Sequence, residues 1–202
     1  MTRANRGMAA LRESRNLVAG FVLVGGQSSR MGRDKAFLPS TSGPLVAEIA
    51  GSLAAVTENV ALVGRPDLFR SLLHYDCLDD VCPGFGPLSG IHTALKSRRG
   101  EYNLILACDM PGADRTLLMS LLQCAAARAV RCVVPVDAAG KKHPLCAVYH
   151  STALEAVEDA IRLSRPRLMD LLSDLDAFPF ECEMTIPNCN TPAEWAAYQS
   201  AK

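Results

Sequence analysis

The sequence predicts an α/β protein whose mostly parallel sheet is covered by helices on both faces. Short apolar runs of strand length alternate along the chain with segments of helical length, which is typical of strand-helix-strand units. Most of these runs are continuously apolar, as expected of parallel strands that are buried on both faces. The first run leads directly into a glycine-rich loop, so a binding site is expected beyond the carboxyl end of that strand.

The first part of the chain predicts three strands and two helices. Residues 17–24 form a continuous apolar strand before the loop, and Pro44 precedes a periodic segment that predicts a helix over 45–56. The remaining elements of this part are a buried strand, a helix that begins at a proline and a short strand, over residues 59–63, 66–73 and 75–78.

The middle of the chain repeats the pattern. A glycine-proline turn precedes a predicted helix over 88–96, and residues 102–107 form the clearest strand in the sequence. That strand ends at Cys108, Asp109 and a proline-glycine turn. A helix over 116–128 and a valine-rich strand over 130–136 follow.

The last part of the chain is less regular. A turn at residues 138–140 precedes a strand over 145–149, which we expect to run antiparallel to the others. The remaining predicted elements are two helices, a last strand and a terminal helix capped by Thr191, over residues 152–163, 168–175, 178–182 and 192–200.

Composition favours a single domain. The chain has 202 residues, of which 49% are hydrophobic and 21% charged, so it is long enough for one sizeable core. We expect a flexible N-terminal tail over residues 1–16, in which Met8 is an alternative start to Met1, and one domain over residues 17–202. No internal repeat, low-complexity block or interdomain linker is visible in the sequence.

Charge and hydropathy exclude several classes of protein. The formal net charge is zero, from 21 cationic and 21 anionic residues, so we expect neither a nucleic-acid partner nor a membrane partner. The basic tail before the apolar run 17–24 imitates a secretory signal. However, the run is short and leads into a polar glycine loop rather than a small-residue cleavage site. We therefore expect a cytoplasmic protein.

The eight cysteines do not predict a metal site or a disulfide framework. No two of them are spaced as C-x-x-C, and most lie in apolar segments. Buried free thiols are the favoured interpretation.

The glycine-rich loop after the first strand is suited to binding phosphate. Glycine lets the backbone bring several N–H donors close to an anion, and cationic side chains add charge. The spacing fits neither a Walker A loop nor a dinucleotide fingerprint, because no Gly-Lys-Ser/Thr and no G-x-G-x-x-G is present in the loop. Its glycines and cations are Gly25, Gly26, Gly32, Arg30, Arg33 and Lys35.

Acidic residues follow two other predicted strands. Asp109 comes just after strand 102–107 and faces the loop across the carboxyl edge, where Mg²⁺ would bridge it to phosphates. The alternative is an aspartate that caps the following turn. Asp79 and Asp80 end the strand 75–78, where one of them would bind a ribose hydroxyl, a base edge or the metal, or would simply be solvated. The glycine-rich turn at 84–90 offers backbone amides at a helix start.

These motifs resemble a known family. The loop reads L-x-G-G-x-S-x-R-M-G-x-D-K, and it is followed by Asp80, G-P-L-S-G at 86–90, C-D-M-P at 108–111, H-P-L at 143–145 and N-C-N-T-P at 188–192. In order and spacing they resemble the MobA-like nucleotidyltransferases, and closely the molybdenum cofactor guanylyltransferase family. The resemblance covers about residues 17–200.

The resemblance implies a Rossmann-like three-layer α/β/α nucleotidyltransferase fold. It also implies transfer of GMP from GTP to the phosphate of molybdenum-molybdopterin, with release of pyrophosphate. Further implied partners are a molybdoenzyme or a cofactor-insertion protein. Arg30, Lys35 and Asp109 are the expected catalytic residues.

The same resemblance implies a nucleotide site. Its expected residues are Leu23, Val24, Gly25, Gly26, Lys35, Asp80 and Asp109, with Asp109 as the Mg²⁺ ligand. Val63 stands where some family members have an asparagine, and we therefore leave it out of the expected site.

Alternatives remain open at this point. A CTP-dependent enzyme acting on the same pterin, or a sugar- or alcohol-phosphate nucleotidyltransferase, would use the same loop. A module that binds nucleotide or pterin and delivers cofactor without catalysis is the alternative from another class, and release of pyrophosphate from GTP distinguishes it.

Contacts to the second substrate are less specific. Asn188 and Asn190 alternate like strand residues and would face the cleft together, although asparagine turns explain them as well. His143 would touch the pterin or be a surface group. Exposed cations are common, and four of them are candidate phosphate contacts: Lys141, Lys142, Arg165 and Arg167.

Overall fold

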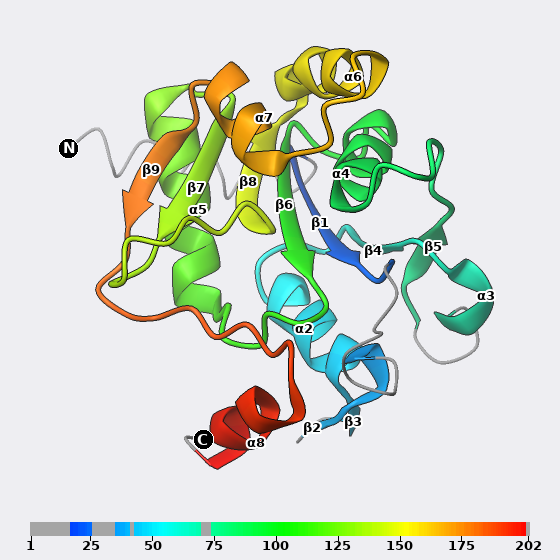
Figure 1. Ribbon diagram of the computed structural model, residues 1–202, viewed down its shortest axis with the longest axis vertical. Helices are drawn as coiled ribbons and strands as arrows, with labels where there is room; N and C mark the ends of the chain where they lie inside the picture. Colours follow the sequence, from blue (N-terminus) through cyan, green and yellow to red (C-terminus); the bar gives the residue numbers. More distant parts are fainter. Residues whose placement is uncertain (1–16, 26–34, 41–42, 70–73, 201–202) are drawn as a thin grey trace.

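The computed structural model describes residues 17–25, 35–40, 43–69 and 74–200. A seven-stranded sheet with the order β5-β4-β1-β6-β8-β7-β9 forms its centre, with helices packed against both faces (Figure 1). The strands are β1 (Val18–Leu23), β4 (Val60–Val63), β5 (Asp76–Leu78), β6 (Tyr102–Ala107), β7 (Cys132–Val136), β8 (Cys146–His150) and β9 (Phe178–Glu181). The predicted Rossmann-like, mostly parallel α/β sheet is confirmed.

The two faces of the sheet carry different helices. Odd and even strand residues divide cleanly: Val22, Leu104 and Leu106 join one apolar cluster, whereas Phe21 and Ile105 join the other. The first cluster includes residues of α2 (Leu45–Ala54), α5 (Arg115–Arg128) and α8 (Pro192–Ser200). The second includes residues of α4 (Pro87–Lys96), α6 (Leu154–Arg162) and α7 (Leu168–Asp174). The three-layer arrangement expected from the continuous apolar strands follows from this division.

Strand β8 runs antiparallel to both of its neighbours, as predicted for residues 145–149. Leu106 at the end of β6 pairs with Cys146 at the start of β8, and Cys132 of β7 pairs with Tyr149. The other strands of the sheet run parallel, so their carboxyl ends share one edge. Any loop after β1, β4, β5, β6 or β7 therefore emerges at that edge.

Several boundaries differ from the sequence prediction. The strand predicted over 130–136 begins at Cys132, because Ala129 ends α5 in the left-handed conformation (φ 52°). Of the helix predicted over 66–73, α3 (Pro66–Phe69) lies within the described residues, and residues 70–73 lie outside them. The helix predicted over 152–163 begins with a 3-10 turn, η3 (Ser151–Ala153).

Three short elements were not predicted. They are η2 (Lys35–Phe37), β2 (Pro39–Ser40) and β3 (Gly43–Pro44), and the two strands pair with each other. Elements of two or three residues carry no hydrophobic period, and proline is depleted in strands, so no sequence pattern indicates them.

All eight cysteines lie in the described part of the chain as free thiols. Cys132, Cys146 and Cys189 are buried, and burial raises the pKa of the Cys146 thiol to about 12. The expectation of buried thiols holds for these three, while the others are partly exposed. Among the described residues, no helix is both long and apolar enough to span a bilayer. The predicted tail, residues 1–16, lies outside the described residues.

Candidate active site

A cavity of about 460 Å³ lies at the carboxyl ends of β1, β4 and β5. The loops after these strands and the start of α4 contribute its walls, which are lined by Leu23, Gly25, Val63, Asp80, Gly84, Gly86, Pro87, Ser89 and Gly90. Three residues of the predicted nucleotide site, Leu23, Gly25 and Asp80, are therefore brought together.

The glycines of the cavity allow backbones to approach closely. Gly64 has a φ of +91°, and a Cβ there would lie 3.3 Å from the Cα and N of Gly25. A Cβ on Gly90 would lie 2.9 Å from Leu23 Cδ2. The Val24 amide donates to the Val63 carbonyl (3.0 Å), which ties the glycine loop to β4. Through these contacts, three segments surround the cavity: the loop after β1, the turn after β4, and helix α4.

Val63, which was left out of the expected site, lines the cavity. In the sequence it is the last residue of a continuous apolar strand, which indicates core. The following Gly64 turns the chain and leaves Val63 at the cavity wall, where it is 1% exposed. Val24 is also buried, and its backbone amide provides the contact described above.

Asp80 is the acidic side chain of the cavity. Its Oδ1 accepts a hydrogen bond from the Thr93 hydroxyl of α4 (3.5 Å). Burial raises the pKa of this carboxyl, the Thr93 hydrogen bond opposes that rise, and the charge of Asp79 adds to it. Asp80 therefore presents a partly desolvated acceptor to a ligand in the cavity.

The turn before α4 is held by its own polar groups. The Phe85 amide donates to Ser89 Oγ (3.1 Å), and the Ser89 amide donates to the Gly86 carbonyl (3.1 Å). Pro87 is the first helical residue, and Gly86 has a φ of 60°. The amino end of α4 is thus fixed against the cavity, as the glycine-rich turn predicted.

Asp109 lies after β6, at the same edge of the sheet. The Cys108 amide donates to the Leu23 carbonyl (3.2 Å), so the segment that carries Asp109 runs beside the end of β1. The Asp109 side chain is partly buried. No group of three or more potential metal ligands occurs among the described residues. One carboxylate at such an edge fits Mg²⁺, which typically takes one or two carboxylates together with water and substrate phosphates.

The segment around Asn188 packs against Asp109. The Cys189 amide donates to the Asp109 carbonyl (2.8 Å), and Asn190 Nδ2 donates to Asn188 Oδ1 (2.7 Å). The predicted cap at Thr191 is confirmed: its Oγ1 accepts the Glu194 amide (3.2 Å), and Glu194 Oε2 accepts the Thr191 amide (2.8 Å). The two asparagines are thereby placed next to Asp109.

His143 is a core residue, not a surface group. It is 3% exposed, and its Nε2 lies 2.8 Å from Asp137 Oδ2. Asp137 Oδ1 also accepts the amides of Ala139 and Lys141 (both 3.0 Å). The pair closes the turn between β7 and β8. Sequence reasoning missed Asp137, although it follows an apolar strand as Asp109 does.

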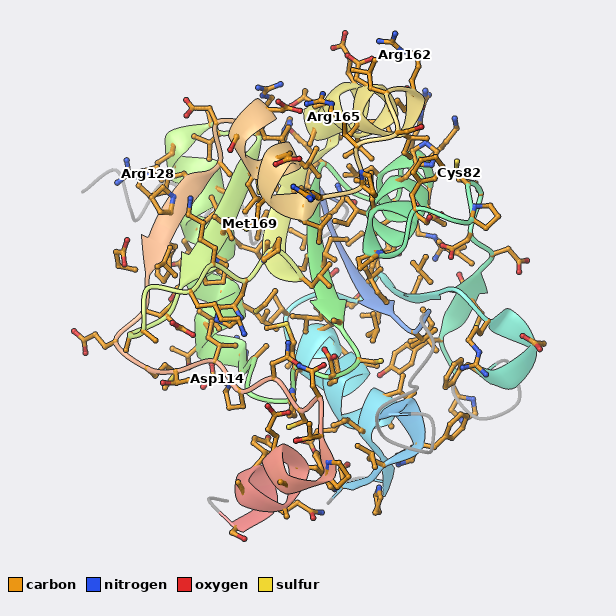
Figure 2. All side chains as sticks on the ribbon, in the orientation of Figure 1. Cys82, Asp114, Arg128, Arg162, Arg165 and Met169 are labelled. Atoms are coloured by element: carbon orange, nitrogen blue, oxygen red, sulfur yellow. The ribbon has the colours of Figure 1, made fainter. Side chains whose placement is uncertain are left out.

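The cationic candidates are dispersed. Arg165 forms an ion pair with Asp174 (3.0 Å) and lies just beyond α6, at the end of the molecule where β6 begins (Figure 2). Arg167, Lys141 and Lys142 are exposed. The structure therefore does not bring Arg165 to the carboxyl edge.

Part of the expected site lies outside the residues that the structure describes. Gly26 and Arg30 lie beyond the described residues, as do Gly32 and Arg33. For Lys35 the backbone begins η2, and nothing is described of its side chain. Their roles stay predictions.

Comparison with known proteins identifies the family. The family model described as "MobA-like NTP transferase domain" matches residues 20–178, which is most of the chain. The chain belongs to the MobA-like NTP transferase family. As a member of this family it is a nucleotidyltransferase, and the resemblance carried by the loop and strand-end motifs is confirmed.

Relatives of this MobA-like NTP transferase share most of its length. A protein of Flavobacterium johnsoniae named "Probable molybdenum cofactor guanylyltransferase" is 33% identical over 76% of this chain and 79% of its own. A Bacillus subtilis protein with the same name is 32% identical over 86% of each chain. The crystal structure of molybdopterin-guanine dinucleotide biosynthesis protein A from Archaeoglobus fulgidus has a TM-score of 0.80 at 21% identity, over 91% of this chain and 97% of that one, which supports the fold.

Proposed function

We propose that this MobA-like NTP transferase transfers GMP from GTP to the phosphate of molybdenum-molybdopterin. The products are the molybdopterin guanine dinucleotide cofactor and pyrophosphate. The observation that carries the proposal is the cavity at the carboxyl edge, where Gly25, Gly64 and Asp80 meet directly before the basic glycine loop. The names of the relatives supply the identity of the two substrates.

The cavity suits the nucleoside end of GTP. Leu23 and Val63 offer apolar contact to a flat base, and the glycine backbones leave room for it. An ionised Asp80 carboxylate accepts hydrogen bonds only. It would accept from the N–H groups of guanine or from a ribose hydroxyl.

The phosphates of GTP would extend from the cavity toward the glycine loop. In this proposal the backbone amides of the loop, Arg30 and Lys35 bind the phosphate chain and stabilise the negative charge that develops on leaving pyrophosphate. Asp109, beside the end of β1, would hold Mg²⁺, which neutralises phosphate charge when bound.

The reaction needs no nucleophile from the protein. A phosphate oxygen of the pterin substrate attacks the α-phosphorus of GTP, and the bond between that phosphorus and the pyrophosphate oxygen breaks. The contribution of the chain is alignment of the two substrates and stabilisation of charge. Asn188 and Asn190 would orient the second substrate, because the Cys189 amide anchors their segment to Asp109.

The test compares nucleotides on the purified protein. Thermal unfolding is measured with GTP, CTP, ATP and UTP in the presence of Mg²⁺, and pyrophosphate release is measured with GTP and molybdenum-molybdopterin. We expect the largest stabilisation with GTP and release that requires both substrates. Preference for CTP would instead indicate the cytidylyl reaction, and tight binding without pyrophosphate would indicate a delivery module.

We also propose the setting of the reaction. The product would pass to a cytoplasmic molybdoenzyme or to a cofactor-insertion protein, since the reaction uses soluble substrates. Co-purification of the guanine dinucleotide cofactor with such a partner tests this part separately.

A further inference from the structure

The two carboxylate oxygens of Asp80 have different surroundings. Oδ1 accepts the Thr93 hydroxyl at 3.5 Å. Oδ2 lies on the glycine side of the cavity, 3.8 Å from the position of a Cβ on Gly25 and 3.9 Å from that of a Cβ on Gly64. Within the described part of the chain, Oδ2 has no hydrogen-bond partner. The carboxylate is therefore oriented with one oxygen toward α4 and the other toward the ligand space.

Thr93 is built into the fold as a bridge. It is 3% exposed in the middle of α4, and its Oγ1 accepts the Val81 amide (3.1 Å) while its hydroxyl proton is directed to Asp80. One buried hydroxyl thus connects α4 both to the backbone after Asp80 and to the Asp80 carboxylate. A hydroxyl can accept one hydrogen bond and donate another, so these two contacts hold Thr93 and Asp80 relative to each other.

We propose that Thr93 is a positioning residue for nucleotide recognition: it fixes Asp80 so that Oδ2 accepts a hydrogen bond from an N–H or O–H donor of the nucleoside. The proposal deepens the proposed function and depends on GTP occupying the cavity. The ligand class is a nucleoside with a donor edge. Without the Thr93 hydroxyl, Asp80 can rotate and either oxygen can turn away from the glycine walls.

Charged and titratable groups occur on the segments that carry or adjoin Asp80. Asp79 and Cys82 are on its own segment, and Arg65 follows Gly64, which lies beside Asp80 Oδ2. On α4, His92 faces α6, where its Nε2 lies 3.5 Å from Glu158. Of these groups, Asp79 acts on the ionisation of Asp80. Loss of the Thr93 hydrogen bond is therefore expected to move the protonation of Asp80 to higher pH.

The experiment measures GTP binding with Mg²⁺ by calorimetry from pH 5 to pH 8. For Thr93→Val we expect a dissociation constant about tenfold higher at neutral pH. We also expect the acid limb of binding, which is the pH range in which GTP affinity falls on acidification, to move to higher pH. Thr93→Ser keeps the hydroxyl and should stay within about twofold of the wild type. Should Thr93→Val not fold, Thr93→Ala repeats the test without added bulk.

The matched control is Thr57→Val. Thr57 is also a buried threonine, and its hydroxyl donates to the Val18 carbonyl (2.6 Å) at the amino end of β1, away from the cavity. This variant is expected to lose stability but to keep the GTP affinity and the acid limb of the wild type. Titration of the GTP phosphates affects all variants equally, so the comparison isolates Asp80.

A second readout separates this inference from the proposed function. Carbon NMR of the Asp80 carboxyl follows its titration in the free protein, with no nucleotide present. If GTP does not bind the wild type, the proposed function fails, and the NMR titration still tests whether Thr93 holds Asp80. If GTP binds, and Thr93→Val matches the wild type in affinity and in the Asp80 titration, the inference is overturned.

Discussion

The main-chain amide of Cys189 donates a hydrogen bond of 2.8 Å to the carbonyl oxygen of Asp109. This bond joins the loop after β6 to the segment before α8, two parts that are distant in sequence. Gly112 lies against Pro187 in the same contact, where an added Cβ would be 2.3 Å from Pro187 Cδ. The proposed metal ligand and the two asparagines thus depend on one close backbone contact.

We predict that Gly112→Ala separates these segments, because neither the proline ring nor the backbone can yield cheaply. The expected result is a fall in turnover of about tenfold or more with GTP affinity unchanged, since small misplacement of a substrate slows reaction strongly. Steady-state pyrophosphate release and GTP calorimetry measure the two effects. Gly51→Ala is the control: it lies in α2 with open space around its Cβ and should raise stability by about 1 kcal/mol. Normal turnover in Gly112→Ala would contradict the idea that turnover depends on the contact between these two segments.

We predict that Asp109→Ala abolishes Mg²⁺-dependent turnover and leaves the fold intact, because the side chain lies at a strand edge rather than in the core. Pyrophosphate release titrated with Mg²⁺ measures the effect. Asp114→Ala is the control. Asp114 Oδ1 caps α5 by accepting the Leu117 amide (2.8 Å), so this variant should lose about 1 kcal/mol of stability and keep activity (Figure 2). Wild-type turnover in Asp109→Ala would refute the metal role.

Lys35→Ala is expected to weaken GTP binding by about tenfold, because one charge-assisted contact to phosphate is lost. Calorimetry at fixed Mg²⁺ tests this. Lys96→Ala, which removes an exposed ion pair with Glu158 (3.2 Å) between α4 and α6, should leave the titration unchanged. An unaltered isotherm for Lys35→Ala would remove Lys35 from the site.

The Asp137–His143 pair predicts an acid dependence of stability. The hydrogen bond from His143, followed by those of the Lys141 and Ala139 amides, lowers the pKa of Asp137 below the usual carboxyl value of about 4. A carboxyl with a lowered pKa in the folded state stabilises the protein above that usual value, and the stabilisation is lost as the pH falls toward the folded pKa.

The test is urea unfolding at a series of pH values from about 3 to 7. Asp137→Asn should be less stable than the wild type at neutral pH, and the difference should shrink on acidification. A difference that stays constant with pH would show that the charge of Asp137 makes no contribution. His143→Ala should lower the melting temperature without changing GTP affinity, since His143 is buried beneath the turn.

The parts of the site that follow apolar strands were predictable from sequence. Parallel strands end at one edge, so Asp80 and Asp109 were expected to lie near the glycine loop, and the structure places both beside the end of β1. The antiparallel direction of β8 was also predicted. These inferences succeed because hydrophobic period and strand order determine the edge at which a residue emerges.

Other features depend on contacts that sequence does not encode locally. Val63 has the pattern of a core residue, and only the left-handed turn at Gly64 leaves it at the cavity. The burial of His143 follows from Asp137, six residues earlier, through a turn whose closure no periodicity reveals. Cys189 and Asp109 are far apart in sequence, so their contact leaves no local pattern. The residues that pack beside it, Gly112 and Pro187, are of types that are common in any loop.

The reversed direction of β8 has a consequence for redesign of the enzyme. Because Cys146 begins β8 opposite the end of β6, the connection from β7 leaves and re-enters the sheet at a single rim. The cavity is built from β1, β4, β5 and α4, whereas this connection lies on the other side of β6 in the strand order. A longer or differently charged connection can therefore be grafted there without changing the residues that line the cavity.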